Sequence, residues 1–149
     1  MRLISILPGS LYTRGKFAYH PRDEKILDLR RKGVDVVVNL TTQGDPDLVG
    51  VEGLEYIHCV MSDGREVDVE TVFVLARKLA ARIQEGKKVL VHCHAGQNRT
   101  GLISSATVAL AMSLTGSQAV DLVQQRRKGS MGTNPDFERY MREDFDNDR

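Results

Sequence analysis

The segment most informative about the fold is KKVLVHCHAGQNRTGLISSATVALAM, Lys87–Met112. Its first part, Lys88–His92, is a short, mostly apolar and β-branched run that is typical of a buried strand. From Arg99 to Leu114 the chain is apolar or small at nearly every position, which predicts a helix buried on most of its faces. A short loop containing Gly96 joins the two. Strand, tight loop and buried helix together indicate one unit of an α/β fold.

The remaining sequence repeats this alternation of strands and helices. Four further segments predict strands: Leu3–Leu7, Ser10–Thr13, Val34–Leu40 and Leu54–Val60. One helical pattern follows Pro21 up to Gly33, and a second runs from an N-cap at Asp68 to Gly86. A third covers Gln118–Lys128 after a cap at Ser117, and the last begins at Asn134–Pro135. The acidic tail EDFDNDR is expected to be a frayed helix end. We therefore expect one α/β domain over residues 1–149, with a mostly parallel central sheet of about five strands and helices on both faces.

Composition excludes several classes of function. The net charge of +1 gives no support for broad electrostatic binding to nucleic acid or to an anionic membrane. The longest apolar segment, Leu102–Leu114, is too short to span a bilayer, so we expect no membrane association. Two cysteines make a poor disulfide framework and favour a reducing, cytoplasmic setting.

Chemistry is expected where the parallel strands end. In open α/β sheets, ligands bind outside the carboxyl ends of the strands. The loops that leave these ends begin at Thr41, Met61 and His94, and they should converge on one edge of the sheet. This convergence would bring Asp63 and Cys93 together although thirty positions separate them in the sequence.

The loop after Lys88–His92 is a candidate anion site. Loop amides that curl around one centre, followed by a helix N-terminus, form a cradle for an oxyanion. The residues expected to hold the anion are His94, Ala95, Gly96, Gln97, Asn98 and Arg99. Cys93 would lie at the floor of this cradle, where the donors stabilise a nucleophilic thiolate. Arg99 offers a planar fork that can bind two phosphate oxygens at once.

Two neighbouring residues are assigned supporting roles. Thr100 can donate its hydroxyl to the sulfur and ease the departure of that sulfur in a second step. His92, at the end of the strand, is expected to organise the loop by hydrogen bonding without touching substrate.

These residues carry a family resemblance. HCHAGQNRTG, His92–Gly101, resembles the H-C-x5-R-S/T-G signature of cysteine-dependent protein tyrosine and dual-specificity phosphatases. More loosely, ILPGSLYTRG, VVVNL and QQRRKGSMGTNPDF are similar to further segments of that family. The resemblance implies a protein-tyrosine-phosphatase-like fold and a two-step reaction through a cysteinyl-phosphate, with no metal or cofactor. It also implies that Asp63 is the general acid that protonates the leaving oxygen.

The resemblance leaves the substrate open. We expect a monomer that acts on a phosphorylated protein, of the tyrosine or dual-specificity type, or on another phosphate monoester. Because NRTG is also similar to the loop of RNA 5′-triphosphatases, that activity is an alternative, and the only one that involves nucleic acid. An inositol lipid phosphatase ranks third. A non-catalytic module that binds phosphate esters is a further alternative, although such modules typically lose the cysteine, the arginine or the acid.

Other interpretations of single residues compete with these. A zinc site could draw on His58, Cys59, His92, Cys93 and His94, but consecutive residues at a strand end cannot all face one ion. Asp45 and Asp47 are reserve candidates for the general acid. Cys59 is expected in the core, with a disulfide to an oxidised Cys93 as a hypothesis. One arginine of Arg126–Lys128 could line the rim of the site, and Asn134 is interpreted as a helix cap more than as a site residue.

Overall fold

The computed structural model describes residues 3–14, 20–64, 66–93, 98–127 and 134–149 of the chain. These residues form a five-stranded sheet in the order β1-β2-β5-β3-β4. Its strands are β1 (Ile4–Leu7), β2 (Leu11–Arg14), β3 (Val36–Asn39), β4 (Glu55–His58) and β5 (Val89–His92). Only the β1–β2 pair is antiparallel, whereas β2, β5, β3 and β4 run parallel to one another. The predicted α/β class and mostly parallel sheet are confirmed.

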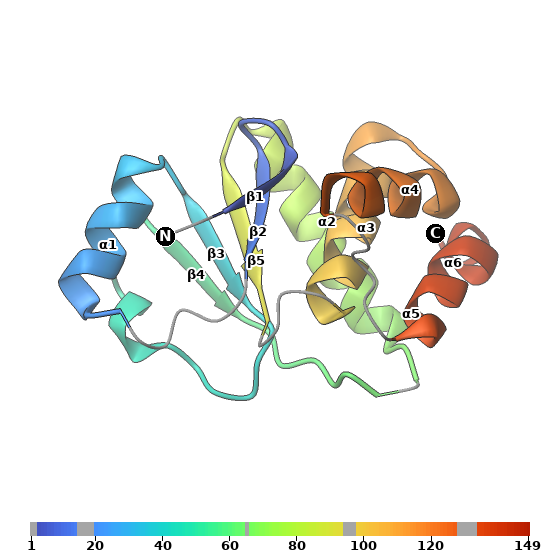
Figure 1. Cartoon of the computed structure of the whole chain (residues 1–149), viewed down its shortest axis with the longest axis horizontal. Helices are drawn as coiled ribbons and strands as arrows, with labels where there is room; N and C mark the ends of the chain where they lie inside the picture. Colours follow the sequence, from blue (N-terminus) through green and yellow to red (C-terminus); the bar gives the residue numbers. More distant parts are fainter. Residues whose placement is uncertain (1–2, 15–19, 65, 94–97, 128–133) are drawn as a thin grey trace.

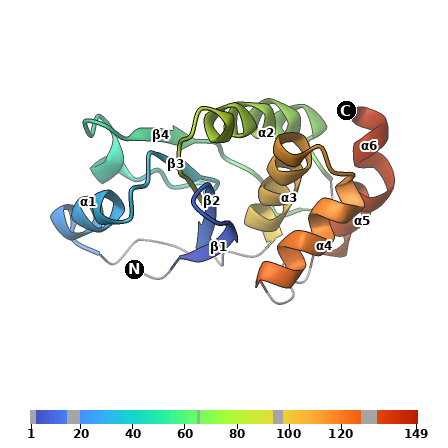
Figure 2. The same cartoon turned by 90° about the horizontal axis from the view of Figure 1, so that it is seen from above.

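Helices cover both faces of the sheet, as expected. The helical elements are α1 (Arg22–Arg31), the short 3-10 helix η1 (Pro46–Leu48), α2 (Val69–Gln84), α3 (Asn98–Met112), α4 (Gly116–Arg127), α5 (Pro135–Arg139), the π-helical turn η2 (Tyr140–Asp144) and α6 (Phe145–Asp148). Figure 1 shows α1 on one side of the strands and α2 to α6 gathered on the other. The view from above in Figure 2 shows the same division.

Alternating side chains of β3 divide the apolar interior into two parts. Val37 packs in a smaller core with Ile26 and Leu29 of α1. Val36 and Val38 point to the opposite face and join the larger core beneath α2 and α3. Helix α3 is buried continuously from Thr100 to Ala109, which explains why its sequence shows no polar face.

Side-chain caps fix where several helices begin. The caps predicted at Asp68 and Asn134 are confirmed, because each side chain accepts a hydrogen bond from the backbone N–H three residues further on. The cap predicted at Ser117 is wrong. Thr115 Oγ1 accepts from the Gln118 backbone N–H at 3.1 Å, and Gln118 Oε1 accepts from the Thr115 N–H at 3.0 Å. This reciprocal capping box starts α4 at Gly116, two residues before the expected position.

The acidic tail is ordered rather than frayed. After α5 the chain widens into the π-helical turn η2 and continues as α6. Phe145 is completely buried and stacks on Phe73 of α2, with ring centroids 4.9 Å apart. A single aromatic residue within a run of charges therefore anchors the C-terminal helix to the main core.

Candidate active site

Three parallel strands end in line at one edge of the sheet. Asn39 of β3 pairs in register with His58 of β4 and with His92 of β5. Cys93 follows directly after β5, is 2% exposed and belongs to the larger core. The loops that begin at Thr41 and Met61 therefore start beside the cysteine, as the parallel topology predicts.

His92 is a neutral, buried histidine. It lies between Arg14 of β2 and Asn39 of β3 in the sheet register and is only 3% exposed. Burial, and after it the positive charge of Arg14, lower the pKa of the imidazole to about 4, against the opposing effect of a hydrogen bond with the backbone of Cys93. Its contact with the Cys93 backbone agrees with the loop-organising role expected for it.

Helix α3 begins immediately after the predicted phosphate-binding loop. Of the expected anion-binding residues, His94, Ala95, Gly96 and Gln97 lie outside the described residues, whereas Asn98 and Arg99 form the start of the helix. Arg99 Nη1 donates to the backbone oxygen of Met61 at 3.4 Å. Within the described part of the chain, the buried Arg99 Nε and the fully buried Thr100 Oγ1 have no hydrogen-bond partner.

Unpaired polar groups are costly inside a protein, by about 1–3 kcal/mol each. Ser104, Ser105 and Thr107 of the same helix also have buried hydroxyls without a described partner. The roles predicted for Arg99 and Thr100 therefore stay predictions.

Asp63 is an exposed residue of the loop between β4 and α2, and its carboxylate is held at both oxygens. Oδ2 accepts from Asn98 Nδ2 at 3.0 Å, and Oδ1 accepts from Asn134 Nδ2 at 2.9 Å. Since Asn98 is the first residue of α3, the predicted general acid and the predicted phosphate-binding loop are in direct contact. The sequence did not indicate this use of Asn134, because an Asn-Pro pair signals a helix cap and says nothing about a partner seventy residues away.

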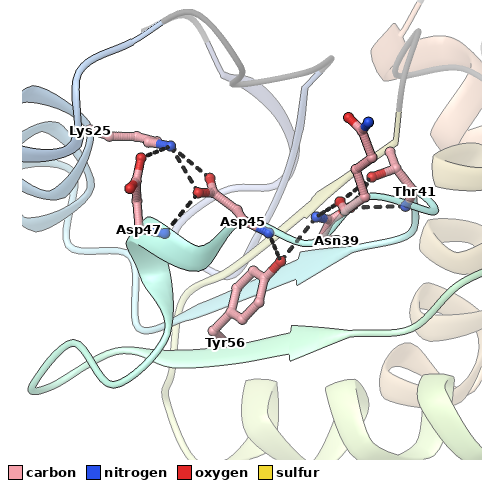
Figure 3. Close-up of polar contacts among 7 residues, drawn as sticks. Lys25, Asn39, Thr41, Asp45, Asp47 and Tyr56 are labelled. Carbon is pink, nitrogen blue, oxygen red and sulfur yellow. Dashed lines mark hydrogen bonds and ion pairs between the residues drawn. The ribbon is translucent and has the colours of Figure 1, made fainter.

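The reserve candidates for the general acid are engaged elsewhere. Lys25 of α1 is 3% exposed and lies between Asp45, at 2.8 and 3.0 Å, and Asp47, at 3.0 Å (Figure 3). Burial opposes the charge of Lys25, but its hydrogen bonds to both carboxylates raise its pKa. Tyr56 accepts a hydrogen bond from the Asp45 backbone N–H at 2.7 Å. These contacts fasten the loop after β3 to α1, which explains why neither aspartate is available for proton transfer.

The sheet register separates the two cysteines. Cys59 follows β4 and Cys93 follows β5, and β3 lies between these strands. With parallel strands about 4.8 Å apart, the two Cα atoms are roughly 10 Å apart. A disulfide requires a Cα separation of about 4.4–6.8 Å, so the bond between Cys59 and Cys93 needs a displaced strand end. Both cysteines are free thiols, and Cys59, predicted to lie in the core, is only partly buried and packs against the larger core. Burial raises the pKa of its thiol.

One arginine from the end of α4 lies near the cysteine. Burial lowers the pKa of Arg127 to about 10, and the electrostatic effect of Cys93, which raises it, shows that the two groups are close enough to interact. Arg126 is exposed, and Lys128 lies outside the described residues. Among the described members of this basic run, Arg127 is therefore the one whose charge interacts with Cys93.

The residues that the structure describes provide neither a metal-binding cluster nor a membrane-spanning helix. In this part of the chain, no three histidine, cysteine, aspartate or glutamate side chains are grouped in a way that could hold a metal ion. Nor does any helix in it have the length and apolar character needed to cross a bilayer.

Comparison with known proteins identifies the class. The family model "Dual specificity phosphatase, catalytic domain" matches residues 19–147. A curated relative, "Protein tyrosine phosphatase domain-containing protein 1" of Bos taurus, is 25% identical over 125 residues, which are 72% of this chain and 16% of the relative. The chain thus spans about a sixth of the length of that relative.

Solved structures give the same result. Tk-PTP in its active form has a TM-score of 0.69 and 27% identity, with 91% of each chain covered. TpbA of P. aeruginosa in complex with pTyr has a TM-score of 0.72 and 25% identity, with 95% of this chain and 84% of that chain covered. The chain belongs to the dual-specificity phosphatase catalytic-domain family.

Proposed function

We propose that the protein hydrolyses phosphate monoesters of proteins, without a metal ion, through a cysteinyl-phosphate intermediate. The observation that carries this proposal is the junction of β5 and α3. Cys93 directly follows β5 and is 2% exposed, and α3 begins with Asn98, which donates a hydrogen bond to Asp63. These observations support a shared site for the proposed nucleophile, the start of the helix and the carboxyl group.

Each step has a residue suited to it. Cys93 Sγ attacks phosphorus, the bond from phosphorus to the ester oxygen breaks, and Asp63 donates a proton to that oxygen. Arg99 and the helix N-terminus hold the charge on the remaining phosphate oxygens. Water then attacks the phosphocysteine, and Asp63 accepts the proton of the water. The sulfur–phosphorus bond breaks while the Thr100 hydroxyl donates a hydrogen bond to the departing sulfur.

The test is hydrolysis of p-nitrophenyl phosphate by the wild type and by Cys93→Ser and Asp63→Asn. We expect no turnover with Cys93→Ser and a loss of about 100-fold or more with Asp63→Asn. A chelator should leave the rate unchanged, whereas vanadate should inhibit. Loss of activity with a chelator would contradict the metal-independent mechanism. A wild type that captures phosphopeptides but does not turn over would instead indicate a binding module.

The substrate class is tested separately. A phosphotyrosine peptide, a phosphoserine peptide and RNA with a 5′-triphosphate are compared at equal concentration. We propose that the phosphotyrosine peptide is the preferred substrate, because TpbA, which has a similar fold, binds pTyr. Faster release of phosphate from the RNA would favour the triphosphatase alternative.

We also propose that the protein acts as a monomer in a reducing compartment such as the cytoplasm. Both cysteines are free thiols. Among the described residues, the large apolar side chains that are exposed come from separate elements, such as Leu27 of α1, Val74 of α2 and Met112 of α3. Light scattering on the purified protein would reveal a dimer if this proposal is wrong.

A further inference from the structure

Asp63, Asn98 and Asn134 form a closed triangle of hydrogen bonds, which we call the amide clamp. Each asparagine Nδ2 donates to a different oxygen of Asp63, at 3.0 and 2.9 Å. The backbone N–H of Asn134 closes the triangle by donating to Asn98 Oδ1 at 3.3 Å. The three residues come from the loop after β4, the start of α3 and the start of α5. The clamp therefore joins segments that are far apart in the sequence.

Chemistry fixes the orientation of both amides. A carboxylate oxygen can only accept, so each asparagine must turn its nitrogen toward Asp63. The other polar groups of Asn134 are also used: Nδ2 donates to the Gly64 backbone oxygen at 3.1 Å, and Oδ1 accepts from the Phe137 N–H at 3.3 Å. Flipping either amide would break several of these bonds at once.

The anchors of the clamp are more buried than the group they hold. Asp63 is exposed, whereas Asn134 is 9% exposed and caps the helix that begins beside the fully buried Phe137. An exposed carboxyl on a loop would otherwise sample several rotamers. Proton transfer requires the acid within hydrogen-bond reach of the leaving oxygen, and a misplacement of about 1 Å can reduce a rate about 100-fold.

We propose that Asn134 is a positioning residue for proton transfer: through the amide clamp it holds the Asp63 carboxyl in place for the leaving group before substrate binds. This inference rests on the proposed function, because it assumes that Asp63 is the general acid. It assigns Asn134 a second role beyond capping α5. It also explains why an acid on an exposed loop can be kept ready without a large closing movement.

The experiment compares two substrates that differ in their need for an acid. p-Nitrophenolate leaves readily, whereas phenolate depends more on protonation, so a misplaced acid should slow phenyl phosphate more than p-nitrophenyl phosphate. In Asn134→Ser, a serine hydroxyl still caps α5 but no amide reaches Asp63. We expect the ratio of kcat/KM for p-nitrophenyl phosphate to that for phenyl phosphate to rise about tenfold, because kcat/KM reports the step in which the leaving group departs. A ratio is unaffected by the fraction of protein that is correctly folded.

Controls separate positioning from stability and from failure of the parent proposal. Asn147→Ser makes the same chemical change at an exposed position of α6 and should leave the ratio unchanged. In the Asp63→Asn background, Asn134→Ser should cause no further change in the ratio. If Asn134→Ser does not fold, Asn134→Thr retains a hydroxyl cap, removes the amide donor without adding a charge beside Asp63, and serves in its place.

The outcomes are distinct. Equal losses for both substrates, or additive effects with Asp63→Asn, would show that Asn134 acts only through stability and would overturn the inference. An unchanged ratio in a folded variant would overturn it too. If the wild type hydrolyses neither substrate, or if Cys93→Ser remains active, the proposed function itself fails.

Discussion

Protonation of His92 should couple the stability of the fold to pH. The side chain is 3% exposed, and its pKa in the folded protein is about 4, against an ordinary value of 6.5. Between pH 4 and pH 6.5, His92 is protonated in the unfolded chain but not in the folded protein. Its contribution to the free energy of unfolding is therefore fully present above pH 6.5 and is lost as the pH falls toward 4. The full difference is about 3 kcal/mol, of which about 2 kcal/mol is lost between pH 7 and pH 5.

Three charged groups near His92 also influence its pKa. Arg14 and Lys25 oppose its protonation and Asp45 favours it, and all of these are included in the lowered pKa of His92. The assay is urea unfolding followed by circular dichroism, since the chain has no tryptophan. His92→Gln should be about 2 kcal/mol less sensitive than the wild type to a change from pH 7 to pH 5. His58→Gln, at an exposed histidine, is the matched control. Parallel curves for the wild type and His92→Gln would refute the reasoning.

Three further predictions follow from particular contacts. Lys25→Met leaves two carboxylates without their cation and should lower the free energy of unfolding by about 3 kcal/mol in the same urea assay; a variant as stable as the wild type would contradict this. Gly116→Ala improves helix propensity, but its methyl group would overlap the backbone carbonyl of Met141, so Tm should fall rather than rise. A higher Tm would show that this close approach is not tight. Peroxide treatment should yield no peptide cross-linked through Cys59 and Cys93, and mass spectrometry that detects one would show that the end of β4 moves toward β5.

Local sequence patterns were enough to predict the strands and the edge of the sheet at which the site lies. The β-branched runs identify the strands, and alternation with helices makes most of them parallel. Parallel strands then require that the residues after Asn39, His58 and His92 share one edge, which the register bears out. Cys93 and Arg99 can be placed beside this edge without coordinates, because Cys93 directly follows a strand and Arg99 lies in the first turn of the next helix.

What sequence could not supply are the partners of side chains that are distant along the chain. DPD at Asp45–Asp47 indicates a turn or helix start, but nothing nearby identifies Lys25 as its cation. The cap of α4 is a different case. Thr115 and Gln118 have the spacing of a capping box, so the sequence does contain the signal for the true cap. Ser117, directly before the expected start of the helix, is also a favourable cap residue and conceals that signal.

The two reacting groups of the proposed mechanism are held by interactions of different kinds. Cys93 is fixed by a buried strand and helix, so its position can be lost only together with much of the core. Asp63 lies on an exposed loop, and its described contacts are hydrogen bonds, each of which contributes on the order of 1 kcal/mol. Substitutions around the acid can therefore alter proton transfer while leaving the nucleophile and the fold intact. Variation in this family domain that tunes the reaction without unfolding the protein is consequently expected at positions such as Asn98 and Asn134, and not in β5 or in the buried part of α3 from Thr100 to Ala109.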